Sequence, residues 1–178
     1  MLVSRFQRRV VVFLACAATL LVGAVHPTPA GANPGDVGYE GFPYSGTGAA
    51  VTGAKPESKV WWNDGRWWAS MWDDTQGDNF IFRLDPLTQA WTNTGVMLDN
   101  RSGTRADVLW DGTKLYVASH AFTNTAVESS AGGRLYRYSY DTANQTYKLD
   151  TGFPTTINGW KTETLVIAKE STGRLWAT

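Results

Sequence analysis

The chain is poor in cysteine and histidine, and this limits the chemistry that it can support. It has one cysteine, Cys16, and two histidines, His26 and His120. Cys16 and His26 fall in a predicted export signal, so the chain after it has no disulfide, no thiolate metal site and a single histidine. Zinc or copper sites built from several histidines are therefore excluded within this chain. An exported domain of this kind must be stabilised by its core alone.

The predicted signal covers residues 1–32. Three arginines precede the uncharged apolar residues 10–25, and the small-x-small sequence Ala30-Gly31-Ala32 follows. The apolar run is too short and too rich in alanine to indicate a membrane anchor. We expect cleavage near Ala32 and secretion. The pair Arg8-Arg9 leaves open whether the general or the twin-arginine route is used.

An excess of positive charge is also missing. The chain has 16 basic and 16 acidic residues, and the predicted signal removes basic residues only. The remainder is slightly acidic, which gives no electrostatic reason for binding nucleic acid or an anionic membrane. We therefore predict no nucleic-acid partner and a chain that is not embedded in a membrane.

Helical periodicity is absent from residue 55 onward. Short apolar segments alternate instead with turn signals such as Asp64-Gly65 and Asp111-Gly112, a pattern typical of all-β proteins. Residues 33–54 are rich in glycine and contain Pro34 and Pro43, so we interpret them as a linker or irregular lead-in.

One cassette occurs three times, at residues 57–70, 107–119 and 163–178. Each copy has an acid, an apolar run, a turn with glycine and a second apolar or aromatic run. The copies start about 50 residues apart, which suits a β-propeller blade of four antiparallel strands. We predict a partial propeller over residues 55–178, with blades at about 55–104 and 105–160 and an incomplete blade at 161–178. Trp61, Trp110 and Val166 are expected at equivalent places in adjacent sheets.

The predicted propeller is incomplete, because the chain holds about two and a half blades and a propeller needs about four to eight. We expect the remaining blades downstream of Thr178. Assembly of several copies into one ring is the alternative.

The repeat resembles the kelch-type propeller family. The matching positions, in order, are Asp85-Pro86, Trp91, Arg105, Asp111-Gly112, Leu115, Tyr116 and Val117. Ala69-Ser70 and Ala118-Ser119 stand where that family has paired glycines, and the Asp and Trp near the turns resemble the Asp-box of sialidase-type propellers. The resemblance implies that the first strand of each blade lines a central channel. It also implies that the loops into that strand, and the loops between strands two and three, form one mouth.

The candidate site residues are those that the resemblance places at this mouth. A base, a spacer and an acid recur there, as Lys55-Pro56-Glu57, Arg105-Ala106-Asp107 and Lys161-Thr162-Glu163. They form either a polar ligand pocket, in which Arg105 holds a carboxylate, or ion pairs that align neighbouring blades. The predicted ligand-binding residues are Arg101, Arg105, Asp107, Trp160, Lys161 and Glu163, and the candidate catalytic residues are Arg105, Asp107, His120 and Glu163.

Three further features have a functional and a structural interpretation. Asp73, Asp74 and Asp78 form either a calcium site or a solvated acidic loop, and no other cofactor is predicted. His120 is either a general base or a structural histidine. Trp160 either stacks on a sugar ring or fills the gap between blades.

Three functions are compatible with these features. The first is a secreted propeller that binds an extracellular ligand or partner, for example a glycan. The second is an extracellular carbohydrate-active enzyme, a sialidase-like hydrolase or lyase, with its site at the mouth. No Gly-x-Ser-x-Gly nucleophile motif is present. The third is a cell-surface scaffold without a small ligand, because fold alone does not decide function.

Overall fold

The computed structural model describes Gly41 and residues 55–101, 103–125, 127–130 and 132–178. The predicted signal, and the predicted linker apart from Gly41, lie outside this range. The described residues contain strands and no helix, which confirms the all-β prediction. They include no helix with the length and hydrophobicity needed to cross a bilayer.

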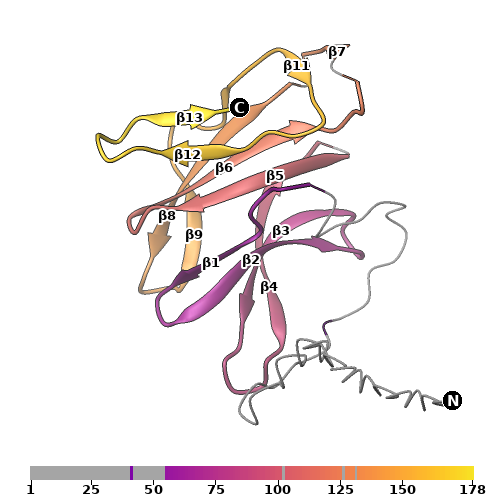
Figure 1. The fold of residues 1–178 in the computed structure, drawn as a ribbon. Helices are drawn as coiled ribbons and strands as arrows, with labels where there is room; N and C mark the ends of the chain where they lie inside the picture. Colours follow the sequence, from indigo (N-terminus) through magenta and orange to yellow (C-terminus); the bar gives the residue numbers. More distant parts are fainter. Residues whose placement is uncertain (1–40, 42–54, 102, 126, 131) are drawn as a thin grey trace, which may run out of the picture. The chain divides into compact units, whose positions relative to one another are not determined.

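The first four strands form an antiparallel meander, here called sheet 1. Its strands are β1 (Val60–Asn63), β2 (Arg66–Asp73), β3 (Asp78–Leu84) and β4 (Trp91–Asp99), paired in that order (Figure 1). β1 and β2 are joined by Asp64-Gly65, and both residues have positive φ, as a two-residue hairpin turn requires. The pairing of β4 with β3 is interrupted by register shifts.

A second meander, sheet 2, follows in the chain. Its members are β5 (Thr104–Trp110), β6 (Lys114–Ala121), β8 (Arg134–Asp141), β9 (Thr146–Leu149) and β10 (Thr155–Thr156). β9 and β10 pair with successive parts of β8, on the edge that faces away from β6. Together they take the place of a fourth strand.

The third unit is the hairpin of β12 (Ile167–Lys169) and β13 (Leu175–Ala177), here called sheet 3. The segment between β6 and β8 contains a short strand, β7 (Val127–Glu128). β7 pairs with β11 (Trp160–Lys161), so this loop is attached to the segment that leads into sheet 3.

The main core lies between sheets 1 and 2 and is aromatic. Tyr147 meets Trp61, Trp68 and Trp110 edge to face, at centroid distances of 5.7, 5.1 and 5.9 Å. Its hydroxyl accepts hydrogen bonds from Trp61 Nε1 and Asn63 Nδ2, both at 2.8 Å, and burial raises its pKa to about 12. Each of these buried rings contributes about 1.5–3 kcal/mol through burial alone, so this core is the main source of stability.

The prediction that Trp61, Trp110 and Val166 are equivalent is wrong. Trp61 lies on the face of sheet 1 that packs on sheet 2, and Trp110 lies on the face of sheet 2 that packs on sheet 1. The two side chains point toward each other, whereas equivalent residues of a repeat point in the same sense. Val166 precedes β12 and exchanges backbone hydrogen bonds with Thr178. A shift of one residue relative to the turn reverses the face on which a side chain lies, and the Asp-Gly alignment contains such a shift.

The first strands of the three sheets lie next to one another in chain order. The Val108 amide of β5 donates to Ser58 O just before β1, at 3.1 Å. On its other side, Asp107 of β5 accepts from the amide of Ile167 at the start of β12, at 2.8 Å. β5 therefore lies between the other two first strands, and all three begin at the same end of their sheets.

Candidate functional site

The residues predicted at the mouth gather where the first strands begin. We call Lys55, Glu57, Arg105, Asp107, His120 and Glu163 the entrance cluster. Lys55 and Glu57 precede β1, Arg105 and Asp107 lie in β5, His120 lies near the end of β6, and Glu163 precedes β12. The antiparallel pairing of β5 with β6 places Arg105 opposite His120.

Asp107 is a connection between sheets. It is buried, and its carboxylate accepts one hydrogen bond from the amide of Ser58 and another from the amide of Ile167. Burial raises its pKa, and the neighbouring carboxylate of Glu57 acts in the same direction. Both oxygens are used to hold β1 and β12 beside β5, which agrees with the structural interpretation of the repeated acid.

Glu57 and His120 form a buried pair. Nε2 of His120 lies 2.8 Å from Oε1 of Glu57, and Nδ1 lies 3.1 Å from the carbonyl oxygen of Thr162. The hydroxyl of Thr162 also lies 3.3 Å from Nδ1, so both ring nitrogens have partners within the chain. Burial favours the neutral form of Glu57, but the hydrogen bond from His120 and the charge of Lys59 outweigh it and lower the pKa of Glu57.

This pair is shielded from solvent. His120 has no exposed surface, and Lys59 Nζ closes the other side of the Glu57 carboxylate at 3.1 Å. A general base must reach a proton on the substrate. His120 instead joins the lead-in to β1, strand β6 and the lead-in to β12, so the geometry favours its structural interpretation.

Arg105 differs from the rest of the cluster because it retains unused hydrogen-bonding capacity. Its guanidinium carbon lies 3.7 Å from the centre of the Phe122 ring, and the residue is partly exposed. Nη1 is buried and has no hydrogen-bond partner among the described residues. A buried donor without a partner costs about 1–3 kcal/mol, so the hydrogen-bonding capacity of this guanidinium is not fully used within the described residues.

Glu163 and Lys55 form an exposed ion pair between the lead-ins to β12 and β1. The pKa of Glu163 is lowered first by Lys55 and, more weakly, by the charge of Arg105. Trp160 and Lys161 form β11 nearby in the chain, and Trp160 is about half exposed. Trp160 therefore does not fill a gap between sheets.

Arg101, a predicted ligand-binding residue, is engaged with its own chain. Its guanidinium makes three contacts of 2.7–3.1 Å with the carboxylate of Asp99 and donates to the carbonyl oxygen of Gly132 at 2.6 Å. Asp99 also accepts from the hydroxyl of Ser119 at 2.6 Å. Burial favours its neutral form, but Arg101 and Ser119 lower the pKa of Asp99. No sequence signal indicated this role of Asp99, which has no counterpart in the repeated cassette.

The predicted calcium-binding loop has another structural explanation. Asp73 accepts from the amides of Thr75 and Gln76 at 2.9 Å and from the side chain of Asn93 at 2.6 Å. Asp78 is partly buried, which raises its pKa. Within the described ranges no group of three or more His, Cys, Asp or Glu side chains is placed to hold a metal ion.

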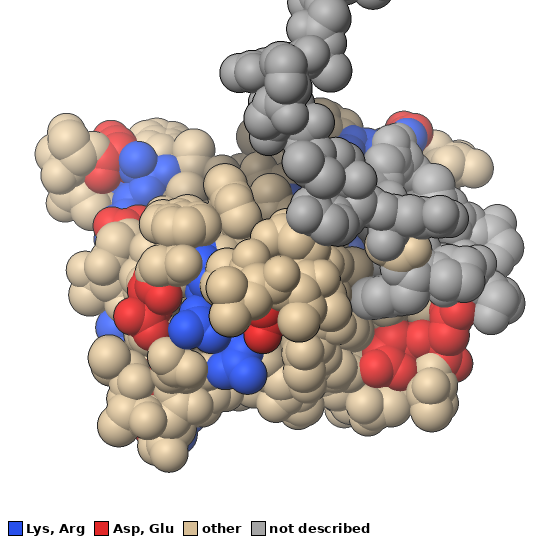
Figure 2. All heavy atoms as spheres, turned by 90° about the horizontal axis from the view of Figure 1, so that it is seen from below, with Lys and Arg blue, Asp and Glu red and all other residues tan. Residues whose placement is uncertain are grey.

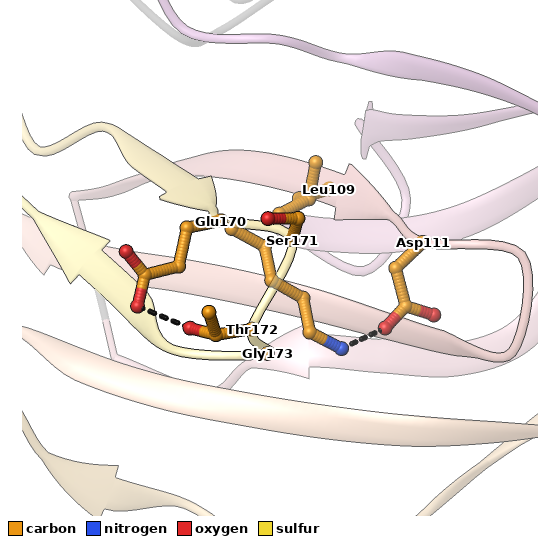
Figure 3. A pocket seen from close by; sticks show the side chains of 7 residues that line it. Leu109, Asp111, Glu170, Ser171, Thr172 and Gly173 are labelled. Carbon is orange, nitrogen blue, oxygen red and sulfur yellow. Dashed lines mark hydrogen bonds and ion pairs between the residues drawn. The ribbon is translucent and has the colours of Figure 1, made fainter.

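Two hollows lie away from the entrance cluster. The first, of about 430 Å³, lies at the opposite end of β5, beside the turn between β12 and β13 (Figure 3). In it Lys169 pairs with Asp111, and Thr172 donates to Glu170 at 2.6 Å. The second, of about 320 Å³, lies between β4 and strands β8 and β9 and is lined by apolar and aromatic side chains together with Asp99, Asn100 and Arg134. Neither hollow contains a predicted site residue.

Comparison with known proteins gives no family for this chain. No family model, no curated protein and no solved structure matches it. Its function must therefore be inferred from the chemistry of its own side chains.

Proposed function

We propose that sheets 1, 2 and 3 are successive blades of a secreted β-propeller that binds an extracellular ligand at the entrance cluster. The ligand class that fits best is a glycan that carries a carboxylate. The propeller arrangement is supported by two consecutive meanders followed by a hairpin, and by the adjacency of β1, β5 and β12.

The observation that carries the ligand proposal is the state of Arg105. Stacking on Phe122 fixes the plane of its guanidinium, while Nη1 remains without a partner among the described residues. A planar guanidinium in a fixed orientation is suited to hold a carboxylate through two parallel hydrogen bonds. Because Nη1 is buried, such a ligand would bind at the exposed part of this partly exposed side chain.

The surroundings of Arg105 favour a sugar acid over a simple anion. Trp160 lies two residues before Thr162, which pairs with Phe122, and about half of its surface is exposed. An exposed indole offers an apolar face to a sugar ring. Lys55 and Glu163 are partly exposed and could exchange their mutual pair for contacts with hydroxyl groups. Together these features support a polar site in which Arg105 is the main anchor for the ligand.

The alternative of a glycoside hydrolase or lyase has weaker support. Such an enzyme needs an acid and a base or nucleophile that face the substrate. Here Glu57 is paired with His120 and Lys59, and Asp107 is held by two backbone amides. Glu163 is accessible but pairs with Lys55. We therefore propose binding without catalysis.

The proposal is tested by calorimetry of the full chain with uronic- and sialic-acid oligosaccharides and with their neutral counterparts. We expect binding only to the acidic sugars, and a loss of affinity of at least about tenfold for Arg105→Ala. Arg105→Lys should keep part of the affinity, because it keeps the charge but loses the planar fork.

Arg83→Ala is the matched control, because it removes an arginine that is also partly exposed but lies in β3 of sheet 1. It should bind as the original chain does. Equal binding by Arg105→Ala, or equal binding of acidic and neutral sugars, would refute the proposed anchor.

A further inference from the structure

The second hollow adjoins the main core at the start of β8. Tyr136 and Tyr138 belong to the core between sheets 1 and 2, and Tyr140 packs against it. Side chains alternate along a strand, so Arg134 lies on the same face of β8 as these tyrosines. From Tyr138 toward Arg134, burial on this face falls from nearly complete to partial. The hollow, which both residues line, is therefore a place where the core opens toward solvent.

Apolar side chains form most of the wall of the hollow. Leu98 of β4 and Tyr138 of β8 are buried, and the hydroxyl of Tyr138 donates to the carbonyl oxygen of Met97 at 3.2 Å. The rings of Tyr136 and Tyr138 are stacked, with centroids 6.4 Å apart and planes inclined by 13°. Leu149, at the end of β9, is exposed and forms part of the rim. The wall is therefore held by contacts between β4 and β8, and its apolar surface suits a flat ring.

The polar part of the lining contains one carboxylate and one cation. Asp99 is the carboxylate, and Arg101 holds it through three contacts of 2.7–3.1 Å. Arg134 is the cation, and it forms no ion pair with any residue that the structure describes. Because Arg101 already balances Asp99, the charge of Arg134 is not balanced by the residues that line the hollow.

The phenol of Tyr136 lies between the apolar wall and this cation. Burial raises the pKa of Tyr136 and the charge of Asp99 adds to this rise, while Arg134 and Arg101 act in the opposite direction. The hydroxyl is therefore protonated at neutral pH, and it lies close enough to Arg134 to feel its charge. A protonated hydroxyl beside an arginine offers a second donor to the same anion.

Charges of both signs are interspersed on the molecular face shown in Figure 2, apart from the area that grey atoms cover. The chain as a whole has 16 basic and 16 acidic residues. A small anion is therefore attracted by individual cations and not by a strong positive field of the whole molecule. Selection of an anion at the hollow then depends on Arg134.

We infer that this hollow binds a small aromatic carboxylate, with the ring on the wall of Leu98 and Tyr138 and the carboxylate on Arg134. Its volume of about 320 Å³ is at the lower end of the range for small-molecule sites, so it suits one ring better than an oligosaccharide. The planar guanidinium group matches a carboxylate through two parallel hydrogen bonds. No residue of the entrance cluster lines this hollow, so the inference is independent of the proposed glycan site.

Fluorine NMR of para-fluorobenzoate with the full chain tests this inference, and para-fluorobenzyl alcohol serves as the uncharged probe. We expect the carboxylate to bind at least about tenfold more tightly than the alcohol, because a charged hydrogen-bonded pair forms only with the carboxylate. Arg134→Leu should remove this preference. Arg134→Lys should keep part of it, because it keeps the charge but loses the planar fork.

A second variant locates the ring of the probe. Leu149→Trp enlarges an exposed side chain at the rim, so it should obstruct the hollow and weaken the binding of both probes. Arg174→Leu is the control, because it removes an exposed arginine next to β13, away from this hollow, and it should bind as the original chain does. Unchanged thermal unfolding of each variant would show that the fold is intact.

The inference is wrong when the full chain binds neither probe. Equal binding of the carboxylate and the alcohol, or a preference that survives Arg134→Leu, would show that Arg134 is not the anchor. Binding that is lost in Arg105→Ala but kept in Leu149→Trp would place the probe at the entrance cluster and not in this hollow.

Discussion

The contact between sheets 1 and 2, which we call the first joint, differs in chemistry from the contact between sheets 2 and 3, the second joint. Sheets 1 and 2 meet through aromatic rings, with Trp61, Trp68 and Tyr147 at the centre. Sheets 2 and 3 meet through charges and backbone amides, including the Lys169–Asp111 pair and the bond from Ile167 to Asp107. Apolar burial is the larger stabilising term, and polar contacts mainly fix relative position. We therefore expect the first joint to dominate stability and the second to set alignment.

The largest effect on stability is expected when an aromatic ring is removed from the first joint. Trp68 has no exposed surface and packs on Tyr147 and Tyr140. Trp68→Ala should lower the free energy of unfolding by about 3–5 kcal/mol, through lost burial and the cavity that remains. Urea unfolding measures this change. A loss below about 1 kcal/mol would mean that the aromatic core is not the main source of stability.

The next largest effect is expected at the buried ion pair. Glu57→Gln removes the negative charge that accepts from His120 and Lys59, and it leaves the ammonium group of Lys59 without its carboxylate partner. We expect a loss of about 2–3 kcal/mol at neutral pH. Glu128→Gln, at an exposed position in β7, is the control and should change stability by less than about 0.5 kcal/mol.

The difference between Glu57→Gln and the original chain should disappear in acid. The pKa of Glu57 is lowered in the folded state, so its charge adds stability above its ordinary pKa of 4.5. That stability is lost as the pH falls through the lowered value, where both chains become neutral at this position. Unfolding curves at pH 7 and pH 3 measure the change. A difference that is the same at both values would contradict the assignment of a charged pair.

A smaller effect of acid on stability is expected at Asp150, which is surrounded by polar side chains of sheet 2. Burial favours its neutral form, but Ser139, Lys114 and Arg137 outweigh this and lower its pKa to about 2. Asp150 therefore adds stability above its ordinary pKa of 3.8, and this stability is lost as the pH falls toward 2. Asp150→Asn should cost about 1–2 kcal/mol at pH 6, and its unfolding should depend less on pH between 4 and 2.

The smallest effect on stability is expected at the Lys169–Asp111 pair, which belongs to the polar contact between sheets 2 and 3. Both side chains are partly exposed. Lys169→Met should change the free energy of unfolding by less than about 1 kcal/mol, and salt should weaken the pair further. Hydrogen exchange of sheet 3 should rise more than that of sheet 1. Equal changes in the two sheets would show that sheet 3 is not held separately.

The sequence predicted the positions of strands and turns better than it predicted the side of the sheet on which each side chain lies. Turn signals such as Asp64-Gly65 located the hairpins, because positive φ has a specific residue preference. The predicted equivalence of Trp61 and Trp110 was wrong, because a cassette match does not show which two residues form the hydrogen-bonded pair that closes each hairpin. The direction of every side chain in the hairpin depends on this pair, which is known only from the hydrogen bonds.

The repeated pattern indicated which residues lie near one another, but not how their side chains are used. The repeated base-and-acid pattern does bring Arg105, Asp107 and Glu163 to one end of the sheets. It could not show that Asp107 is used by backbone amides or that His120 is fully buried, because both facts depend on neighbouring sheets. The stacking of Arg105 on Phe122 joins residues with no shared motif, so no sequence signal pointed to it.

The division of the indole side chains into buried and exposed groups has a practical consequence. Trp61 and Trp68 are buried between sheets, while Trp62, Trp67 and Trp176 face solvent. The emission of the first group should lie at shorter wavelengths and resist iodide, and that of the second group should lie at longer wavelengths and be quenched. A contact made at the surface would alter the long-wavelength emission without altering the short-wavelength part, whereas unfolding would alter both. A single cuvette could thus follow surface contacts and denaturation as separate optical signals, without any added dye.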